Sequence, residues 1–325
     1  MDREAVISHL GSAWDETIAL VRSSLETDIP LLRSANESIL SHDGKQLRPM
    51  LCLLMARACS GGKTTSETVR YAAASELLHN ATLFHDDVAD GSDRRRGYPT
   101  ALSMLGPRAA VLLGDFWLAR AVETILSAGC REDVFKLFSK TLTDLSEGEM
   151  LQLGKAELAD TTEEDYYRII YCKTASLFEA SCVTGAMSVH AGGKEVAAAR
   201  EYSRALGIAF QIKDDILDYA GKEELGKPLG ADLRERKITL PLLGALRSTP
   251  DQAHFRQMVR SLPFHPENID VLRDFVFSSG GVEYAQARLD DYVDKALAAL
   301  EGGLPASEDR ALLEEIARYN SSRTL

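Results

Sequence analysis

The sequence predicts an all-α protein that forms one large helical domain over residues 1–325. No proline occurs between Pro107 and Pro228, and helix interiors exclude proline, so this long stretch favours one helix after another. Apolar residues recur at spacings of three and four, whereas the alternation typical of strands is scarce. No Pro- or Ser-rich linker divides the chain, so we expect a single domain although the length alone suggests two.

The expected helices follow one another with short breaks. The stretch 107–128, for example, places Leu112, Phe116 and Ala119 on one helical face. The breaks contain glycine- or proline-bearing turns, such as the GKEELGKPLG segment that begins at Gly221. We expect helices over residues 3–25, 46–59, 66–91, 107–128, 131–152, 162–189, 194–219, 238–247, 268–277, 280–300 and 308–319.

Composition excludes several classes of protein. The chain contains 45% hydrophobic and 26% charged residues, an ordinary globular balance, and its formal net charge of -12 argues against a nucleic-acid partner. Five cysteines without a CxxC pair argue against a disulfide framework or a zinc site and indicate buried thiols in a reducing compartment. The N-terminus lacks the pattern of a secretion signal, and no apolar run is long enough to span a bilayer. We therefore expect a cytoplasmic protein without stable membrane insertion.

Two clusters of aspartates share the pattern DDxxD near the ends of predicted helices: Asp86, Asp87 and Asp90, and Asp214, Asp215 and Asp218. On an α-helix the first and last aspartate of each cluster lie on one face, about 6 Å apart along the axis. A solvated acidic face is the simpler interpretation of a single cluster. The helix macrodipole, however, disfavours anions at C-terminal ends by roughly 0.3–1 kcal/mol each, so two such placements suggest a compensating cation.

The residues around the clusters favour a metal-bridged diphosphate. Carboxylates suit Mg²⁺, which also takes oxygens from substrate phosphates. Basic residues that could contact a phosphate follow each cluster: Arg94, Arg95 and Arg96 after the first, and Lys222 and Lys227 after the second.

The chain resembles the trans-isoprenyl diphosphate synthases of the polyprenyl synthetase family over roughly residues 40–300. The resemblance rests on an ordered set of motifs: GKQLRP at 44–49, HDDVADGSDRRRG at 85–97, LLGD at 112–115, EGEMLQ at 147–152, KTASLF at 173–178, GIAFQIKDDILDY at 207–219 and GKPLGADLRERKITLP at 226–241. It implies an all-α bundle around a deep central cavity, the isoprenoid synthase type I fold, usually as a homodimer.

The resemblance also implies roles for individual residues. The six aspartates would hold about three Mg²⁺ ions on an allylic diphosphate such as farnesyl diphosphate. Arg95 would contact that diphosphate. Four residues would bind isopentenyl diphosphate: Lys45, Arg48, His79 and Arg96. Five would line the reacting centre or the leaving diphosphate: Lys173, Thr174, Gln211, Lys227 and Lys237.

Product length is a separate hypothesis. In this family the fifth position before the first aspartate often forms the floor of the growing chain; here it is Ala81, with Thr82 at the fourth. A small Ala81 leaves room where an aromatic ring would occupy about 150–250 Å² of surface. We therefore expect a medium- or long-chain, octaprenyl-like product, although Ala81 in a tight helix contact is the simpler interpretation.

Some alternatives stay open. A short-chain farnesyl or geranylgeranyl diphosphate synthase differs only in product length. A class I terpene cyclase or head-to-head condensing enzyme needs no second diphosphate site, and a non-catalytic synthase subunit is free to lose one aspartate motif. Glu147, Glu149 and Gln152 are either solvated or part of an inner polar network, Phe178 is expected in the core, and His85 is expected to pack or to orient a carboxylate.

Overall fold

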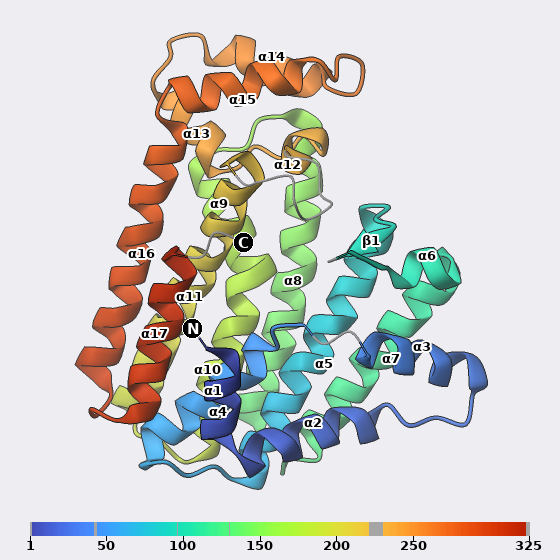
Figure 1. The fold of residues 1–325 in the computed structure, drawn as a ribbon, viewed down its shortest axis with the longest axis vertical. Helices are drawn as coiled ribbons and strands as arrows, with labels where there is room; N and C mark the ends of the chain where they lie inside the picture. Colours follow the sequence, from blue (N-terminus) through green and yellow to red (C-terminus); the bar gives the residue numbers. More distant parts are fainter. Residues whose placement is uncertain (1, 42–43, 96, 130, 221–229, 323–325) are drawn as a thin grey trace. The chain divides into compact units, whose positions relative to one another are not determined.

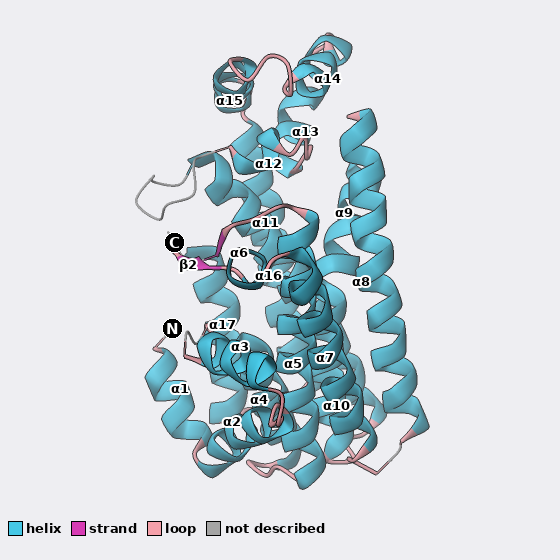
Figure 2. Cartoon of the chain, turned by 90° about the vertical axis from the view of Figure 1, so that its right-hand side faces the viewer, coloured by secondary structure: helices cyan, strands magenta, loops and turns pink. Residues whose placement is uncertain are grey.

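The computed structural model describes residues 2–41, 44–95, 97–129, 131–220 and 230–322. Within these residues the regular secondary structure is helical apart from one short hairpin (Figures 1 and 2). The first elements are α1 (Arg3–Leu10), α2 (Ser12–Ser24), α3 (Pro30–Leu40), α4 (Leu47–Ser60), α5 (Ser66–Ala89), β1 (Arg94–Arg95), β2 (Tyr98–Pro99), α6 (Ala101–Leu105) and α7 (Pro107–Leu126).

The remaining elements continue the helical pattern. They are α8 (Glu132–Leu158), α9 (Glu163–Ile170), the π-helical turn η1 (Tyr171–Ala175), α10 (Ser176–Ser188), α11 (Gly193–Ala220), α12 (Ala231–Arg234), α13 (Leu240–Arg247), α14 (Gln252–Ser261), α15 (Asn268–Ser278), α16 (Gly281–Gly303) and α17 (Glu308–Ser322). The prediction of an all-α protein is therefore confirmed.

The differences from the predicted helices have local causes. The helix expected over 3–25 is two helices, because Gly11 adopts a φ of 54° between them. The helix expected over 131–152 continues to Leu158 and ends before Ala159, which has a φ of 50°. Helices α3, α6, α12 and α14 and the β1–β2 hairpin were not predicted; α3 begins at Pro30, a typical first helical residue.

The chain folds into two compact units, each assembled from segments that are distant in sequence. Unit 1 comprises Met1–Ser139, Leu177–Arg200 and Leu300–Leu313. Its long helix α5 packs against α2, α4 and α7 (Figure 1). The ring of Trp117 on α7 is fully buried and lies edge-on to Phe84 on α5, with a centroid distance of 5.3 Å. The Trp117 indole also donates a 2.9 Å hydrogen bond to the Asn36 side chain, so α3 is tied to this core.

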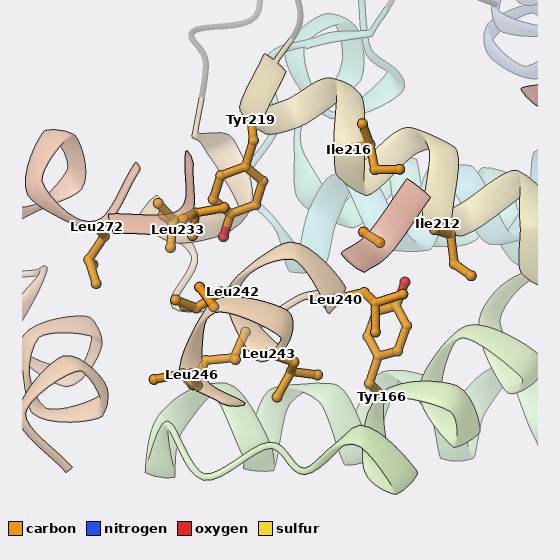
Figure 3. Close-up of a cluster of buried hydrophobic side chains, with 14 of the residues drawn as sticks. Tyr166, Ile212, Ile216, Tyr219, Leu233, Leu240, Leu242, Leu243, Leu246 and Leu272 are labelled. Atoms are coloured by element: carbon orange, nitrogen blue, oxygen red, sulfur yellow. The ribbon is translucent and has the colours of Figure 1, made fainter. Parts of the chain in front are cut away.

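Unit 2 comprises Lys140–Ser176, Glu201–Ala299 and Glu314–Leu325. Its core is a cluster of buried side chains from α9, α11, α13, α15 and α16, among them Tyr166, Ile212 and Leu240 (Figure 3). Helix α12 contributes Leu233 to the same cluster, and the segment between α12 and α13 contributes Ile238. This core holds α11, which carries Gln211 and the second aspartate cluster, and α9, which leads into the turn that carries Lys173 and Thr174.

In the part of the chain that the structure describes, every helix is too short or too polar to cross a membrane. Cys52, Cys172 and Cys182 are buried free thiols, as predicted, and Cys59 is a partly exposed free thiol. Burial raises the pKa of Cys52 to about 12, so this thiol stays protonated at neutral pH.

Candidate active site

The first aspartate cluster lies at the C-terminal end of α5 in unit 1. Asp86 is half-buried, Asp87 is buried with 3% exposure, and Asp90 is exposed as the residue that caps the helix. Successive residues of a helix point about 100° apart, so Asp87 turns into the protein while Asp86 and Asp90 share an accessible face. The three carboxylates of the motif therefore have different surroundings.

Arg95 of the hairpin partners the buried carboxylate. Its Nε and Nη2 lie 3.0 and 2.9 Å from the same Asp87 oxygen, Oδ1. A buried carboxylate without a partner is costly, so this ion pair explains how Asp87 can be inside. The guanidinium predicted to contact an allylic diphosphate is thus engaged by Asp87 in this structure, and the two residues hold the hairpin against α5.

The basic residues predicted to bind isopentenyl diphosphate are placed separately along unit 1. Lys45 is exposed just before α4, and Arg48 lies half-buried in the first turn of α4. The Arg48 guanidinium stacks on the ring of Phe178, 4.8 Å from its centroid. His79 is half-buried on α5, and its carbonyl accepts a hydrogen bond from the Thr82 hydroxyl. Arg96 lies outside the described residues.

The predicted chain-length residues lie one to two turns before the first cluster. Ala81 is buried with 1% exposure, and Thr82 is half-buried. His85, between them and the aspartates, faces α7: its Nε2 lies 3.3 Å from an Asp115 carboxylate oxygen. A Cβ added at Gly114 would collide with the His85 ring, so this glycine lets α5 and α7 approach closely.

The second aspartate cluster ends α11 in unit 2 and repeats the pattern of the first. Asp215 is buried with 3% exposure, while Asp214 and Asp218 are half-buried. Both Asp215 oxygens accept hydrogen bonds, Oδ2 from the Tyr166 hydroxyl at 2.6 Å and Oδ1 from the Gln211 amide at 2.9 Å. Burial and then the nearby charge of Asp232 raise the pKa of Asp215 well above its ordinary value.

Asp218 fixes the start of α12, the helix that follows it along the described chain. Its two carboxylate oxygens accept the backbone N–H groups of Ala231 and Asp232 at 3.0 and 3.2 Å. Its carbonyl accepts the N–H of Gly230, which has a φ of 77° that favours glycine. The last aspartate of the motif is therefore held in place by backbone donors as well as by its helix.

A π-helical turn between α9 and α10 carries Lys173 and Thr174. Such turns insert an extra residue into a helix and are common at functional sites. The Thr174 hydroxyl donates to the Gln211 side-chain oxygen at 3.0 Å. Because Gln211 also donates to Asp215, its amide orientation is fixed, and a hydrogen-bonded chain runs from Thr174 through Gln211 and Asp215 to Tyr166.

The hydrogen-bonded side chains of Gln211, Asp215 and Tyr166 border a cavity of about 120 Å³ in unit 2. Three of the predicted reacting-centre residues line it: Lys173, Gln211 and Lys237. The Lys237 ammonium is mostly buried and forms an ion pair with Glu235. Thr174 reaches the cavity wall through Gln211. Lys227 lies outside the described residues.

Several residues of this site were missed in the sequence. Tyr166 is 49 residues from Asp215, and no spacing or motif links the two. Asp232, Thr239 and Gln152 also line the cavity. Gln152 and Glu149 belong to the EGEMLQ motif, whose inner or outer position the sequence left open; Glu149 contacts Lys173, whereas Glu147 pairs with Arg168 near the surface.

The carboxylate oxygens of the two aspartate clusters are the type of ligand that Mg²⁺ prefers. Among the described residues, no three acidic, imidazole or thiol groups form a closed metal cage. Mg²⁺ rarely needs such a cage, because it usually binds one or two carboxylates together with water and substrate phosphate. An accessible pair of aspartates four residues apart, as at Asp86 and Asp90, offers that kind of ligand set.

Comparisons with known proteins identify the family. The sequence model of the Polyprenyl synthetase family matches residues 29–275. Octaprenyl diphosphate synthase of Escherichia coli (strain K12) is 40% identical over 288 residues, 87% of each chain. A decaprenyl diphosphate synthase of Rhodobacter capsulatus superposes with a TM-score of 0.91 and 34% identity over 99% of each chain. A polyprenyl synthase of Caulobacter crescentus CB15, solved with calcium and isoprenyl diphosphate, gives 0.90 and 34% over 100% of this chain and 98% of that chain.

The chain belongs to the polyprenyl synthetase family and has the all-α isoprenoid synthase fold. It is an enzyme of the prenyltransferase class, and its similarity to the octaprenyl and decaprenyl diphosphate synthases groups it with the medium- and long-chain enzymes.

Proposed function

We propose that this protein elongates an allylic diphosphate by head-to-tail condensation with isopentenyl diphosphate and yields an all-trans polyprenyl diphosphate. One observation carries the proposal: two DDxxD motifs share the same arrangement of burial. In each, the first and last aspartates are half-buried or exposed, whereas the second is buried on specific partners. Accessible carboxylates one helical turn apart are suited to hold Mg²⁺ on a diphosphate.

We propose that different residues bind the leaving diphosphate and the diphosphate of isopentenyl diphosphate. Mg²⁺ bound at the two motifs would neutralise the negative charge of the leaving diphosphate. Arg95 would bind the allylic diphosphate. The diphosphate of isopentenyl diphosphate, which is not cleaved in the reaction, would be bound by Lys45, Arg48, His79 and Arg96. The hydrogen-bonded Thr174 and Gln211 would present fixed dipoles beside the allylic cation. Lys173, Lys227 and Lys237 would attract the departing diphosphate, which itself can take the proton.

We propose that the product is medium- or long-chain, near octaprenyl in length. The small, buried Ala81 supports this, because no bulky side chain stands at that position of α5. We also propose that both compact units belong to one catalytic domain, since the family match at 29–275 includes residues of each.

A homodimer is proposed from the surface of α7. Leu112, Ala119 and Leu126 recur every seven residues and are all exposed, with Leu112 66% exposed. Such an apolar stripe is suited to pack against a second copy of the chain. Sedimentation equilibrium would measure the mass of the assembly.

The direct test is incorporation of labelled isopentenyl diphosphate by the purified protein alone. With farnesyl diphosphate and Mg²⁺, we expect label in an apolar product, and EDTA should stop its formation. A non-catalytic subunit would incorporate nothing without a partner. A terpene cyclase would consume the allylic diphosphate without using isopentenyl diphosphate. Either result would overturn the proposal.

A further inference from the structure

The proposed reacting-centre residue Lys173 has an acidic partner, Glu149 of the EGEMLQ motif, to which the resemblance assigned no role. Its Nζ lies 2.5 Å from Oε1 of Glu149 on α8. The two side chains are 22% and 27% exposed, so the ion pair is shielded from bulk water on most sides. Interactions between charges weaken less with salt in such surroundings than at an open surface. The contact therefore favours side-chain conformations of Lys173 that keep its ammonium beside Glu149.

The backbone of α8 is built to bring Glu149 to this place. At Gly148, an added Cβ would lie 2.7 Å from the Cys172 Cβ and 3.0 Å from the Lys173 Cγ. Only a residue without a side chain allows α8 to approach the π-helical turn so closely. The next residue along α8 is Glu149, which contacts Lys173 in the same turn.

A lysine side chain does not by itself hold its ammonium in one position. Its flexible four-carbon stem ends in an ammonium with three donors and no fixed geometry. The bond to Glu149 uses one donor, and Lys173 also lines the cavity that Gln211 and Asp215 border. A carboxylate on one side of the ammonium restricts where this flexible side chain can lie beside the cavity.

We propose that Glu149 is a positioning residue that holds the Lys173 ammonium at the cavity for the departing diphosphate. This inference rests on the proposed function, because it assumes that Lys173 takes part in prenyl transfer. Glu149 acts only through Lys173 and does not itself contact a substrate.

The test is a double-mutant cycle with a matched control. Glu149→Gln keeps the shape of the side chain but removes its charge, and we expect kcat to fall roughly 10- to 100-fold, as for other misplaced catalytic groups. Glu149→Asp should recover part of this loss. Glu147→Gln lies two residues away on the same helix and removes the exposed pair with Arg168, whose atoms are 3.6 Å apart. It should stay within about twofold of the unchanged protein.

Lys173→Ala decides between positioning and a purely structural role. If Glu149 acts through Lys173, the double variant Glu149→Gln/Lys173→Ala should be no slower than Lys173→Ala alone. Losses that multiply in the double variant, or a Glu149→Gln variant as active as Glu147→Gln, would overturn the inference while the proposed function stands. If the protein without any substitution incorporates no isopentenyl diphosphate, the proposed function is wrong, and the inference that rests on it is wrong as well.

Discussion

The aspartates of each DDxxD motif differ in burial, and the sequence alone does not show this difference. Asp86 and Asp87 are identical and adjacent, yet only Asp87 is inside, paired with Arg95. The sequence predicts that they point about 100° apart, but which of them faces the interior depends on the tertiary packing around α5. Residue type and spacing therefore identified the motif, whereas the different surroundings of its members required the structure.

Tyr166 provides a test of the buried aspartate in the second motif. Tyr166→Phe removes the hydroxyl that donates to Asp215 at 2.6 Å and leaves a buried carboxylate oxygen without this donor. We expect the free energy of unfolding to fall by about 1–3 kcal/mol in urea titrations, with reduced activity.

Tyr167→Phe is the matched control, because its ring lies edge-on to that of Tyr166 with a centroid distance of 5.4 Å. It removes the same atom from a neighbouring, half-buried position. Equal stabilities of the two variants would show that the bond to Asp215 has little effect on stability.

Ala81 tests the proposed length of the product. Ala81→Phe adds a ring to a buried position five residues before Asp86, where the proposed chain would grow. We expect shorter products when they are separated by thin-layer chromatography after removal of the diphosphate. An unchanged product distribution from a folded variant would remove Ala81 from the floor of the tunnel.

Among the helices, long apolar periodicity predicted the principal elements, and local backbone features decided the rest. Gly11 divides the first helix because it adopts a positive φ, which the spacing of apolar residues cannot indicate. The turn at Tyr171–Ala175 lies within a predicted helix, and periodicity does not distinguish its π-helical form from an α-helix; Gly148 of α8 and Gly207 of α11 lie close against it. Short elements such as α12 contain too few residues for a periodic signal.

Because α8 lies so close to this turn, we predict that a single methyl group added at Gly148 destabilises the protein. Gly148→Ala would place a Cβ 2.7 Å from that of Cys172, so either helix must shift. We expect a loss of stability of about 1–3 kcal/mol in urea titrations and a clear loss of activity.

Gly154→Ala serves as the control on the same helix. Among the described residues, no atom outside its own stretch of helix lies within 4 Å of its added Cβ. Alanine favours helix over glycine, so this variant should gain up to about 1 kcal/mol. If Gly148→Ala were stabilised to the same degree, the helix would not depend on close contact at Gly148.

For the molecule as a whole, the ordered motifs carried more information than composition. Net charge and cysteine content excluded classes of protein but indicated no reaction. The motifs along residues 40–300 predicted the family that the match at 29–275 confirms. Partners such as Tyr166 with Asp215, and Glu149 with Lys173, could not be predicted, because contacts between distant segments arise only when the helices pack.

The size of the product is the sharpest test of the proposed elongation. Purified protein is supplied with farnesyl diphosphate, excess isopentenyl diphosphate and Mg²⁺, and the extracted prenyl chains are sized by mass spectrometry. We expect a series of chains that lengthen by one isoprene unit and end near the octaprenyl length. A reaction that ends at fifteen or twenty carbons would contradict the proposed length, and products without added isoprene units would contradict elongation itself.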